Sequence, residues 1–328
     1  MTGGGGERLL AGMSPDAQQD FALAFLSILF EGAPFILLGT LISGLIDVYL
    51  PAGTMDRFLP NNKFLAVVVA GLLGTVFPVC ECAVVPVIRR LVKKGLPVSC
   101  GLTYMLAAPI VNPITALSTW KAFQGQGAGM MTCSRLLLGF LIAVAVGLIV
   151  SKLSLAAVLK PSLLASMEND AKDLKSPRRF FMPMQIPAAG ERLIAAMRSA
   201  MKDFVDVAVY FSIGVAITAL FNTGIAPGAE WLDTLATNQT AAPAALMGLA
   251  FILSLCSTSD AFIAATLDKF SWGAKLAFLT FGPMMDVKLI FLYQSVLRKR
   301  FIFLLAIGLF VAIGGLSIFL QSMILIIK

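Results

Sequence analysis

Eight apolar segments follow one another along the chain and constrain its fold more than any other feature. Each meets or approaches the roughly 20 residues that a helix needs to cross the hydrocarbon core of a bilayer. They are approximately Phe21–Leu50, Phe64–Ile88, Leu96–Trp120, Met131–Val150, Phe204–Phe221, Ala241–Leu267, Trp272–Leu297 and Phe301–Ile327. With 58% hydrophobic and 13% charged residues, the 328-residue chain carries more apolar side chains than a soluble domain of this length can bury. The sequence therefore predicts an all-α integral membrane protein.

The basic residues lie in short clusters between the apolar segments. We attribute the net charge of +7 to cytoplasmic loops and expect no nucleic-acid partner. The longest polar stretch, 151–202, is predicted to be a basic cytoplasmic linker between a first transmembrane repeat at 21–150 and a second at 203–328. Residues 1–20 form a polar tail without the basic-then-apolar order of a cleavable signal peptide. We expect a multi-pass protein of the cytoplasmic (inner) membrane, with the lipid bilayer around it.

The two halves of the chain carry matching residues. Three pairs agree on an offset of about 175 positions, as in transporters built from internal repeats: Glu31 with Asp206, Cys80 with Cys256, and Asn112 with Asp286. If all eight segments cross fully, the basic run Arg298–Arg300 lies outside, which conflicts with the positive-inside rule. If the two Cys-bearing segments are re-entrant, this run and the linker both lie inside. We therefore favour six full spans and two re-entrant hairpins in inverted halves, although Lys269 and Lys275 then face outward.

Polar and helix-breaking residues interrupt the second segment at Pro78-Val79-Cys80-Glu81-Cys82. Proline removes a helical hydrogen bond, and broken backbone at membrane depth is tolerated only where protein buries it or where it lines a wet cavity. Thiolates select soft species such as trivalent arsenic or copper(I), so Cys80 and Cys82 are candidate metal ligands. Glu81 is costly in a membrane unless it faces water, is protonated or has a partner. The alternatives are that the cysteines are small apolar fillers and that the segment ends near Cys80.

Further candidates come from the other interrupted segments. A second helix break in the first half frees backbone carbonyls and offers a side-chain amide. Polar residues stand at the matching positions of the second half. Helix ends of this kind present dipoles to a solute or ion. The predicted solute-binding residues are Cys80, Glu81, Cys82, Pro109, Asn112, Pro113, Cys256, Ser257, Asp260, Pro283 and Asp286. Lys288 is a counter-charge for Asp286, and Glu31, Glu81 and Asp206 are the predicted proton-coupling acids. A structural proline kink is the alternative reading of Pro109 and Pro113.

Several absences narrow the mechanism. The chain has no G-x-x-x-x-G-K-[ST] loop, no His and no C-x-x-C pair. These gaps argue against ATP hydrolysis by a P-loop, against His-ligated haem or zinc and against a Ser-His triad. We therefore expect no cofactor and no enzyme, but a secondary transporter or channel, or a membrane subunit that depends on a partner for energy.

Two stretches carry a resemblance to a known family. Phe77–Pro86 and Met105–Ile114 are similar to the two signatures of a widespread family of predicted bacterial permeases, whose best understood branch exports trivalent organoarsenicals. The resemblance implies about eight hydrophobic segments, the cytoplasmic membrane and solute export, with the substrate held at Cys80 and Cys82. In the first signature the exporters carry Cys-Ser-Cys-Gly, whereas this chain has Glu81 in place of the serine and Ala83 in place of the glycine. An anionic neighbour disfavours ionisation of a thiol to a thiolate and favours capture of a cation. The chain thus looks more similar to a branch without an assigned substrate, whose members are often thought to work beside a second small membrane protein.

The sequence therefore predicts a permease that moves a small solute or ion, a thiophilic metal ion or metalloid, coupled to protons. Two alternatives stay open. The first is a membrane thiol-redox carrier in which Cys80 and Cys256 form or exchange a disulfide. The second is a membrane subunit of a two-component permease complex, with a second membrane subunit as partner.

Overall fold

The computed structural model describes residues 15–50, 60, 62–76, 79–167, 189–225 and 241–327, and the regular elements in these ranges are helices. The long helices are α2 (Pro15–Tyr49), α8 (Ala128–Val150), α11 (Ala189–Ile225) and α17 (Lys299–Ile327). The shorter ones are α4 (Lys63–Val76), α5 (Glu81–Lys93), α6 (Val98–Ala107), α7 (Pro113–Ala122), α9 (Leu155–Val158), α13 (Ala241–Leu253), α14 (Asp260–Thr266), α15 (Trp272–Met284) and α16 (Val287–Tyr293).

Five stretches of the described chain are long and apolar enough to cross a membrane. They are Gln18–Tyr49, Ala128–Val150, Gly190–Leu220, Trp272–Tyr293 and Lys299–Ile324. Shorter apolar helices, α4, α6 and α13, accompany them. The predicted all-helical, multi-pass architecture is confirmed at this level, whereas eight separate segments and inverted halves stay predictions.

Four of the predicted apolar segments are each divided into two helices. The divisions separate α4 from α5, α6 from α7, α13 from α14, and α15 from α16. Pro78, which we expected to cause the first division, lies outside the described residues. The second and fourth divisions end at capping side chains: Asn112 accepts a hydrogen bond from the Ile114 amide, and Asp286 accepts one from the Leu289 amide. Each half thus shows the same order of a long helix, two divided helices and a long helix.

The chain reverses its direction between α4 and α5. Along α4, Gly71 packs against Thr103 and Gly74 against Ala108, so α4 and α6 run in the same direction. The α5 helix is joined to α6 by a tight turn, in which the Leu96 amide donates to the Leu91 carbonyl at 2.9 Å. The α5 helix therefore runs against α6, and the first divided segment folds back on itself.

The packing of α4 against the α6–α7 division requires a residue without a side chain. A Cβ atom at Gly74 would lie 2.8 Å from the Ala108 Cα and 2.9 Å from the Val111 carbonyl oxygen, both backbone atoms that cannot step aside. We expect Gly74→Ala to lower the free energy of unfolding by about 1–3 kcal/mol through overpacking. Gly248→Ala in α13 is the matched control, because nothing lies within 4 Å of its Cβ position. There alanine should be neutral or stabilising by up to about 1 kcal/mol. Thermal unfolding in detergent measures both, and equal effects would contradict the close approach.

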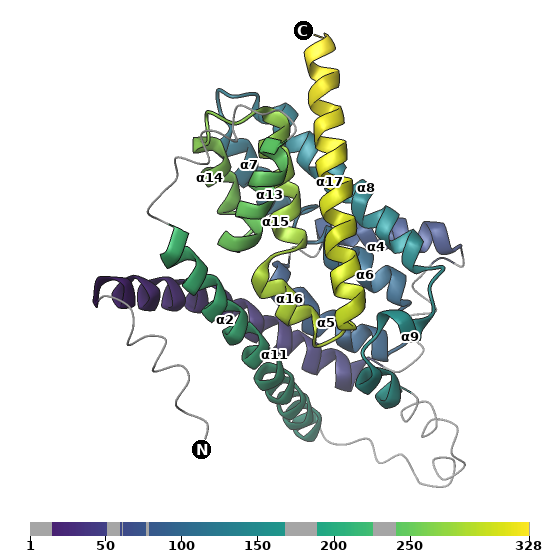
Figure 1. Ribbon diagram of the computed structural model, residues 1–328. Coiled ribbons are helices and arrows are strands. Elements are labelled where there is room, and N and C mark those ends of the chain that lie inside the picture. Colours follow the sequence, from purple (N-terminus) through teal and green to yellow (C-terminus); the bar gives the residue numbers. More distant parts are fainter. Residues whose placement is uncertain are drawn as a thin grey trace.

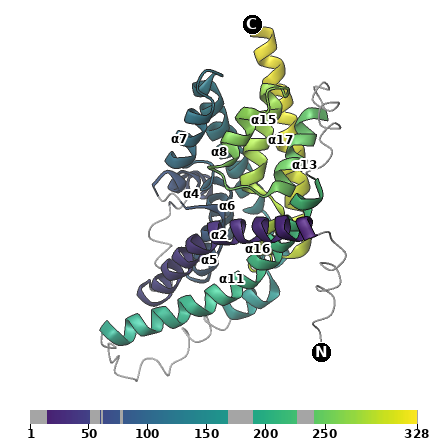
Figure 2. The same cartoon turned by 90° about the vertical axis from the view of Figure 1, so that its left-hand side faces the viewer.

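The long helices α2 and α11 pack against each other at one end of the molecule, where α5 and α16 also lie. The helices α7, α13 and α14 lie toward the opposite end (Figure 1). A view from the side shows the same division, with α2 and α11 crossing beneath the other helices (Figure 2). The α2 helix contacts α5, and α11 contacts α16, so the first long helix of each half covers this end of the core.

The basic segments gather at this same end. The residues after α8 pair with the turn between α16 and α17 through an antiparallel bridge of Leu159 with Leu297. The Lys160 amide donates to the Val296 carbonyl at 2.9 Å, and the Arg298 amide donates to the Val158 carbonyl at 3.0 Å. The start of the predicted linker and the basic run from Arg298 to Arg300 therefore lie together, as the positive-inside rule requires. The last part of the predicted linker is helical, because α11 begins at Ala189.

Candidate functional site

The Cys-bearing divisions of the two halves meet inside the molecule. Glu81 is the first residue of α5, and Cys80 precedes it in extended backbone. Ser257 lies in the non-helical stretch between α13 and α14. The Ser257 hydroxyl donates a hydrogen bond to Glu81 Oε2 at 3.5 Å. Residues that the sequence placed at matching positions of the two halves are thus in direct contact.

A buried cluster of charges lies at this junction. Lys288, in the first turn of α16, has its Nζ atom 3.4 Å from Glu81 Oε1 and 3.6 Å from Asp286 Oδ2. It also donates to the Ser254 carbonyl at 2.8 Å. Glu81, Asp286 and Lys288 are at most 4% exposed. Buried charges are tolerated when they are paired and hydrogen-bonded. Lys288 therefore pairs with both carboxylates and links the two halves, whereas the sequence suggested only its pairing with Asp286.

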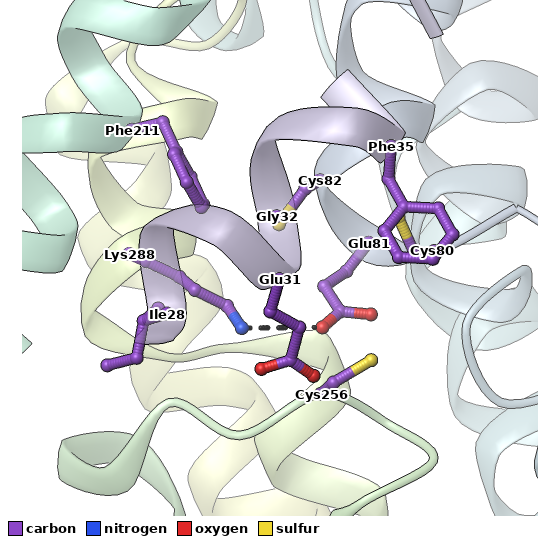
Figure 3. Close-up of a pocket in the computed structure, with 10 residues that line it drawn as sticks. All are labelled: Ile28, Glu31, Gly32, Phe35, Cys80, Glu81, Cys82, Phe211, Cys256 and Lys288. Atoms are coloured by element: carbon purple, nitrogen blue, oxygen red, sulfur yellow. Dashed lines mark hydrogen bonds and ion pairs between the residues drawn. The ribbon is translucent and has the colours of Figure 1, made fainter. Parts of the chain in front are cut away.

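A small cavity opens beside Glu81 and Lys288 (Figure 3). Its lining consists of Ile28, Glu31, Gly32, Phe35, Cys80, Glu81, Cys82, Phe211, Cys256 and Lys288. The cavity volume of about 20 Å³ admits a single water molecule or a dehydrated small ion. Figure 3 shows the Glu31 carboxylate, from α2, directed toward Cys256 and the ion pair. The cavity thus joins two carboxylates and two thiols of the first half with a thiol and an ammonium group of the second half.

A second buried ion pair lies next to the first cluster. Arg135 of α8 is 1% exposed, and its Nη2 atom lies 2.7 Å from Asp260 Oδ2 at the start of α14. The same nitrogen donates to the Ser257 carbonyl at 3.0 Å, and Nη1 donates to the Thr119 hydroxyl at 2.8 Å. Ser257 therefore touches both clusters, through its hydroxyl at Glu81 and through its carbonyl at Arg135.

Arg135 is a buried charged residue of this region that sequence reasoning missed. It lies inside the predicted apolar segment Met131–Val150, which contains no other charged residue. An arginine within an apolar segment is itself a signal, because intramembrane charges face the protein interior and mark functional sites. That signal also predicts a buried acid as its partner, and Asp260 meets the expectation.

The remaining predicted site residues lie at or near helix ends and not at the cavity. Asn112 and Asp286 serve as helix caps, while the Pro109 carbonyl accepts a hydrogen bond from the Thr115 hydroxyl. Pro113 opens α7, and Pro283 lies in the last turn of α15. The described residues that line the cavity include none of these five. Roles for them in solute binding stay predictions.

The two symmetry-related acids differ in their surroundings. Glu31 lines the cavity and has no ion-pair partner within the described residues. Asp206 of α11 is about half exposed, and its Oδ2 atom lies 3.4 Å from Arg89 Nη1. The structure therefore brings Glu31 to the cavity beside the charged cluster, whereas Asp206 forms a separate ion pair with Arg89 of α5.

The cysteines are all free thiols. Cys80, Cys82 and Cys256 line the same cavity, whereas Cys100 and Cys133 do not. No group of three or more Cys, Asp or Glu side chains in the described part of the chain is arranged to hold a metal ion.

The chain matches the model of a family described as predicted permease, ArsP_1, over residues 18–326. It is 36% identical over 282 residues to the UPF0718 protein YcgR of Bacillus subtilis, a match that covers 86% of this chain and 90% of that protein. It is 30% identical over 279 residues to a Streptococcus mutans protein named "Putative two-component membrane permease complex subunit", with 85% of this chain and 87% of that protein covered. No solved structure matches the chain.

Proposed function

Because the chain belongs to the predicted permease family ArsP_1, we propose that it moves a small solute across the cytoplasmic membrane through the cavity beside Glu81. The observation that carries the proposal is the meeting of two non-helical breaks, one from each half, at a buried charged cavity. Irregular backbone and charge at membrane depth occur where a solute path needs them. Membership of this family favours a transporter over an enzyme.

The folding-back of α4 and α5 supports a re-entrant hairpin whose tip carries Cys80 and Glu81. The corresponding break in the second half carries Cys256 and Ser257, and the two breaks touch through Ser257 and Glu81. Binding sites formed by discontinuous helices at the interface of two repeats are typical of secondary transporters. We therefore infer inverted halves with the solute bound between their hairpin tips.

The proposed substrate is a dehydrated soft cation or a small metalloid. The cavity has room for a particle of that size and offers the sulfur atoms of Cys80, Cys82 and Cys256, which are soft ligands. Conduction requires binding that is favourable enough for entry and weak enough for release.

The charged cluster supports coupling to protons. Glu81 and Asp286 share the single counter-charge of Lys288, so the three side chains carry an excess negative charge when both acids are ionised. In a low-dielectric interior such an excess favours uptake of a proton or a cation. We propose that Glu81 exchanges its ion pair with Lys288 for the substrate or a proton, and that Glu31 receives the ion at the cavity wall.

A metal panel tests the thiol-dependent path. Cells that lack their own exporters would express the wild type, C80A/C82A, or the matched control C100A/C133A, whose cysteines lie outside the cavity. We expect the wild type and the control to lower intracellular arsenite, antimonite or copper(I), measured by mass spectrometry, and C80A/C82A to lose this effect. Equal metal content in all three strains, with equal protein levels, would contradict a thiol-bound substrate.

A second candidate function is that of a membrane subunit in a two-component complex. The name of the Streptococcus mutans relative favours it, and so does the long match to that protein. In this case transport requires a second membrane protein encoded by the same organism. Transport by the purified chain alone in proteoliposomes would exclude that requirement.

A further inference from the structure

A second and larger cavity lies at the basic end of the molecule, away from the proposed solute site. Its volume is about 500 Å³, which is within the range of small-molecule binding sites. The polar residues that line it are Lys160, Tyr210, Gln294, Arg298, Lys299 and Arg300. They come from the segment after α9, from α11, from the turn between α16 and α17, and from the start of α17.

The charge of this cavity is positive and uncompensated. Lys160, Arg298, Lys299 and Arg300 line it together, and no Asp or Glu of the described chain does. None of the four cations forms an ion pair with a described residue. Lys160 instead donates to the Tyr210 hydroxyl at 3.2 Å and lies 5.5 Å from the centre of its ring. Four like charges around one concave site attract an anion.

The basic residues are held in place by the backbone. The bridge between Leu159 and Leu297 fixes the residue before Lys160 against the residue before Arg298. Two amide-to-carbonyl hydrogen bonds of 2.9 and 3.0 Å flank this bridge. The cations therefore converge because the fold places them there, and the positive end of the α17 dipole adds to their field, since α17 begins at Lys299.

The apolar residues next to the cavity indicate what kind of anion fits. A candidate membrane span begins at Lys299, so the basic cavity lies at a membrane boundary. One turn further along α17, Phe303 and Leu304 are each 67% exposed. Basic pockets between membrane helices on the cytoplasmic side bind anionic lipid head groups. We propose that this cavity binds the phosphate of an anionic phospholipid, whose acyl chains lie along the α17 face that carries Phe303 and Leu304.

Lipid binding to the purified protein tests the proposal. Thermal unfolding in detergent would be followed with added phosphatidylglycerol, phosphatidylcholine or inorganic phosphate. We expect phosphatidylglycerol to stabilise the wild type more than the other two. In R298Q/K299Q/R300Q the midpoint concentration of phosphatidylglycerol should rise at least about tenfold, because each basic residue near anionic lipid contributes roughly 1 kcal/mol.

The control variant is K152Q/R198Q/K202Q. It removes the same number of charges at exposed positions that do not line the cavity, and it should bind phosphatidylglycerol like the wild type. K160Q removes the remaining basic residue of the lining and should weaken binding in the same direction as the triple variant. Equal loss in the control would show that only net charge matters and would overturn the site. Equal stabilisation by inorganic phosphate would assign the cavity to a soluble phosphate and overturn the lipid.

Discussion

Replacing Lys288 by Met is expected to lower the free energy of unfolding by about 3–5 kcal/mol. The substitution leaves Glu81 and Asp286 buried without the cation that lies 3.4 and 3.6 Å from them. Removal of one partner from a buried ion pair costs this much because the remaining charge is uncompensated. Methionine has a similar length, so lost packing contributes little. Unfolding of the purified protein in mixed micelles, titrated with a denaturing detergent, measures the change.

Glu81→Gln provides the contrast to Lys288→Met. It removes one carboxylate but leaves Lys288 paired with Asp286, so the loss of stability should be clearly smaller. The double variant E81Q/K288M should be less destabilised than the sum of the two single variants, since each removes a charge that the other leaves unpaired. Simple additivity would show that Glu81 and Lys288 do not interact. A stable K288M protein would show that water or protons compensate the acids.

The sequence predicted the architecture well where the information is local. Apolar length predicted the all-helical, multi-pass architecture, and the divisions at Asn112 and Asp286 fall where a polar capping residue interrupts an apolar run. Capping depends on backbone amides two or three residues away, so a linear pattern reveals it. The early start of α11 at Ala189 was missed because residues 189–202 are polar, and the span was read from apolar character alone.

The candidate site was only partly predictable, because its contacts join distant parts of the chain. Cys80, Glu81 and Cys256 were found, since a polar group in an apolar segment is anomalous wherever it folds. The pairing of Lys288 with Glu81 was not found. It depends on how helix breaks from distant parts of the chain meet, and no periodicity encodes that distance. For the same reason, the sequence did not separate Glu31, at the cavity, from Asp206, which pairs with Arg89.

Arg135→Leu is expected to be as damaging as Lys288→Met, with a loss of about 3–5 kcal/mol in stability. The variant leaves the Asp260 carboxylate buried without a counter-charge and frees the Ser257 carbonyl and the Thr119 hydroxyl. Because Ser257 also contacts Glu81, the change should reach the proposed solute site. Unfolding in mixed micelles measures the stability, and metal content of expressing cells measures transport.

Arg135→Lys separates the charge from the geometry. Lysine keeps the ion pair with Asp260, but a single ammonium cannot reproduce the planar fork that reaches Asp260, Ser257 and Thr119 together. We therefore expect R135K to recover most of the stability lost in R135L but to transport less than the wild type. Full transport by R135K would reduce Arg135 to a structural counter-charge. Loss of both properties in R135K would show that the orientation of Ser257, and not the buried charge, holds the two helix breaks together.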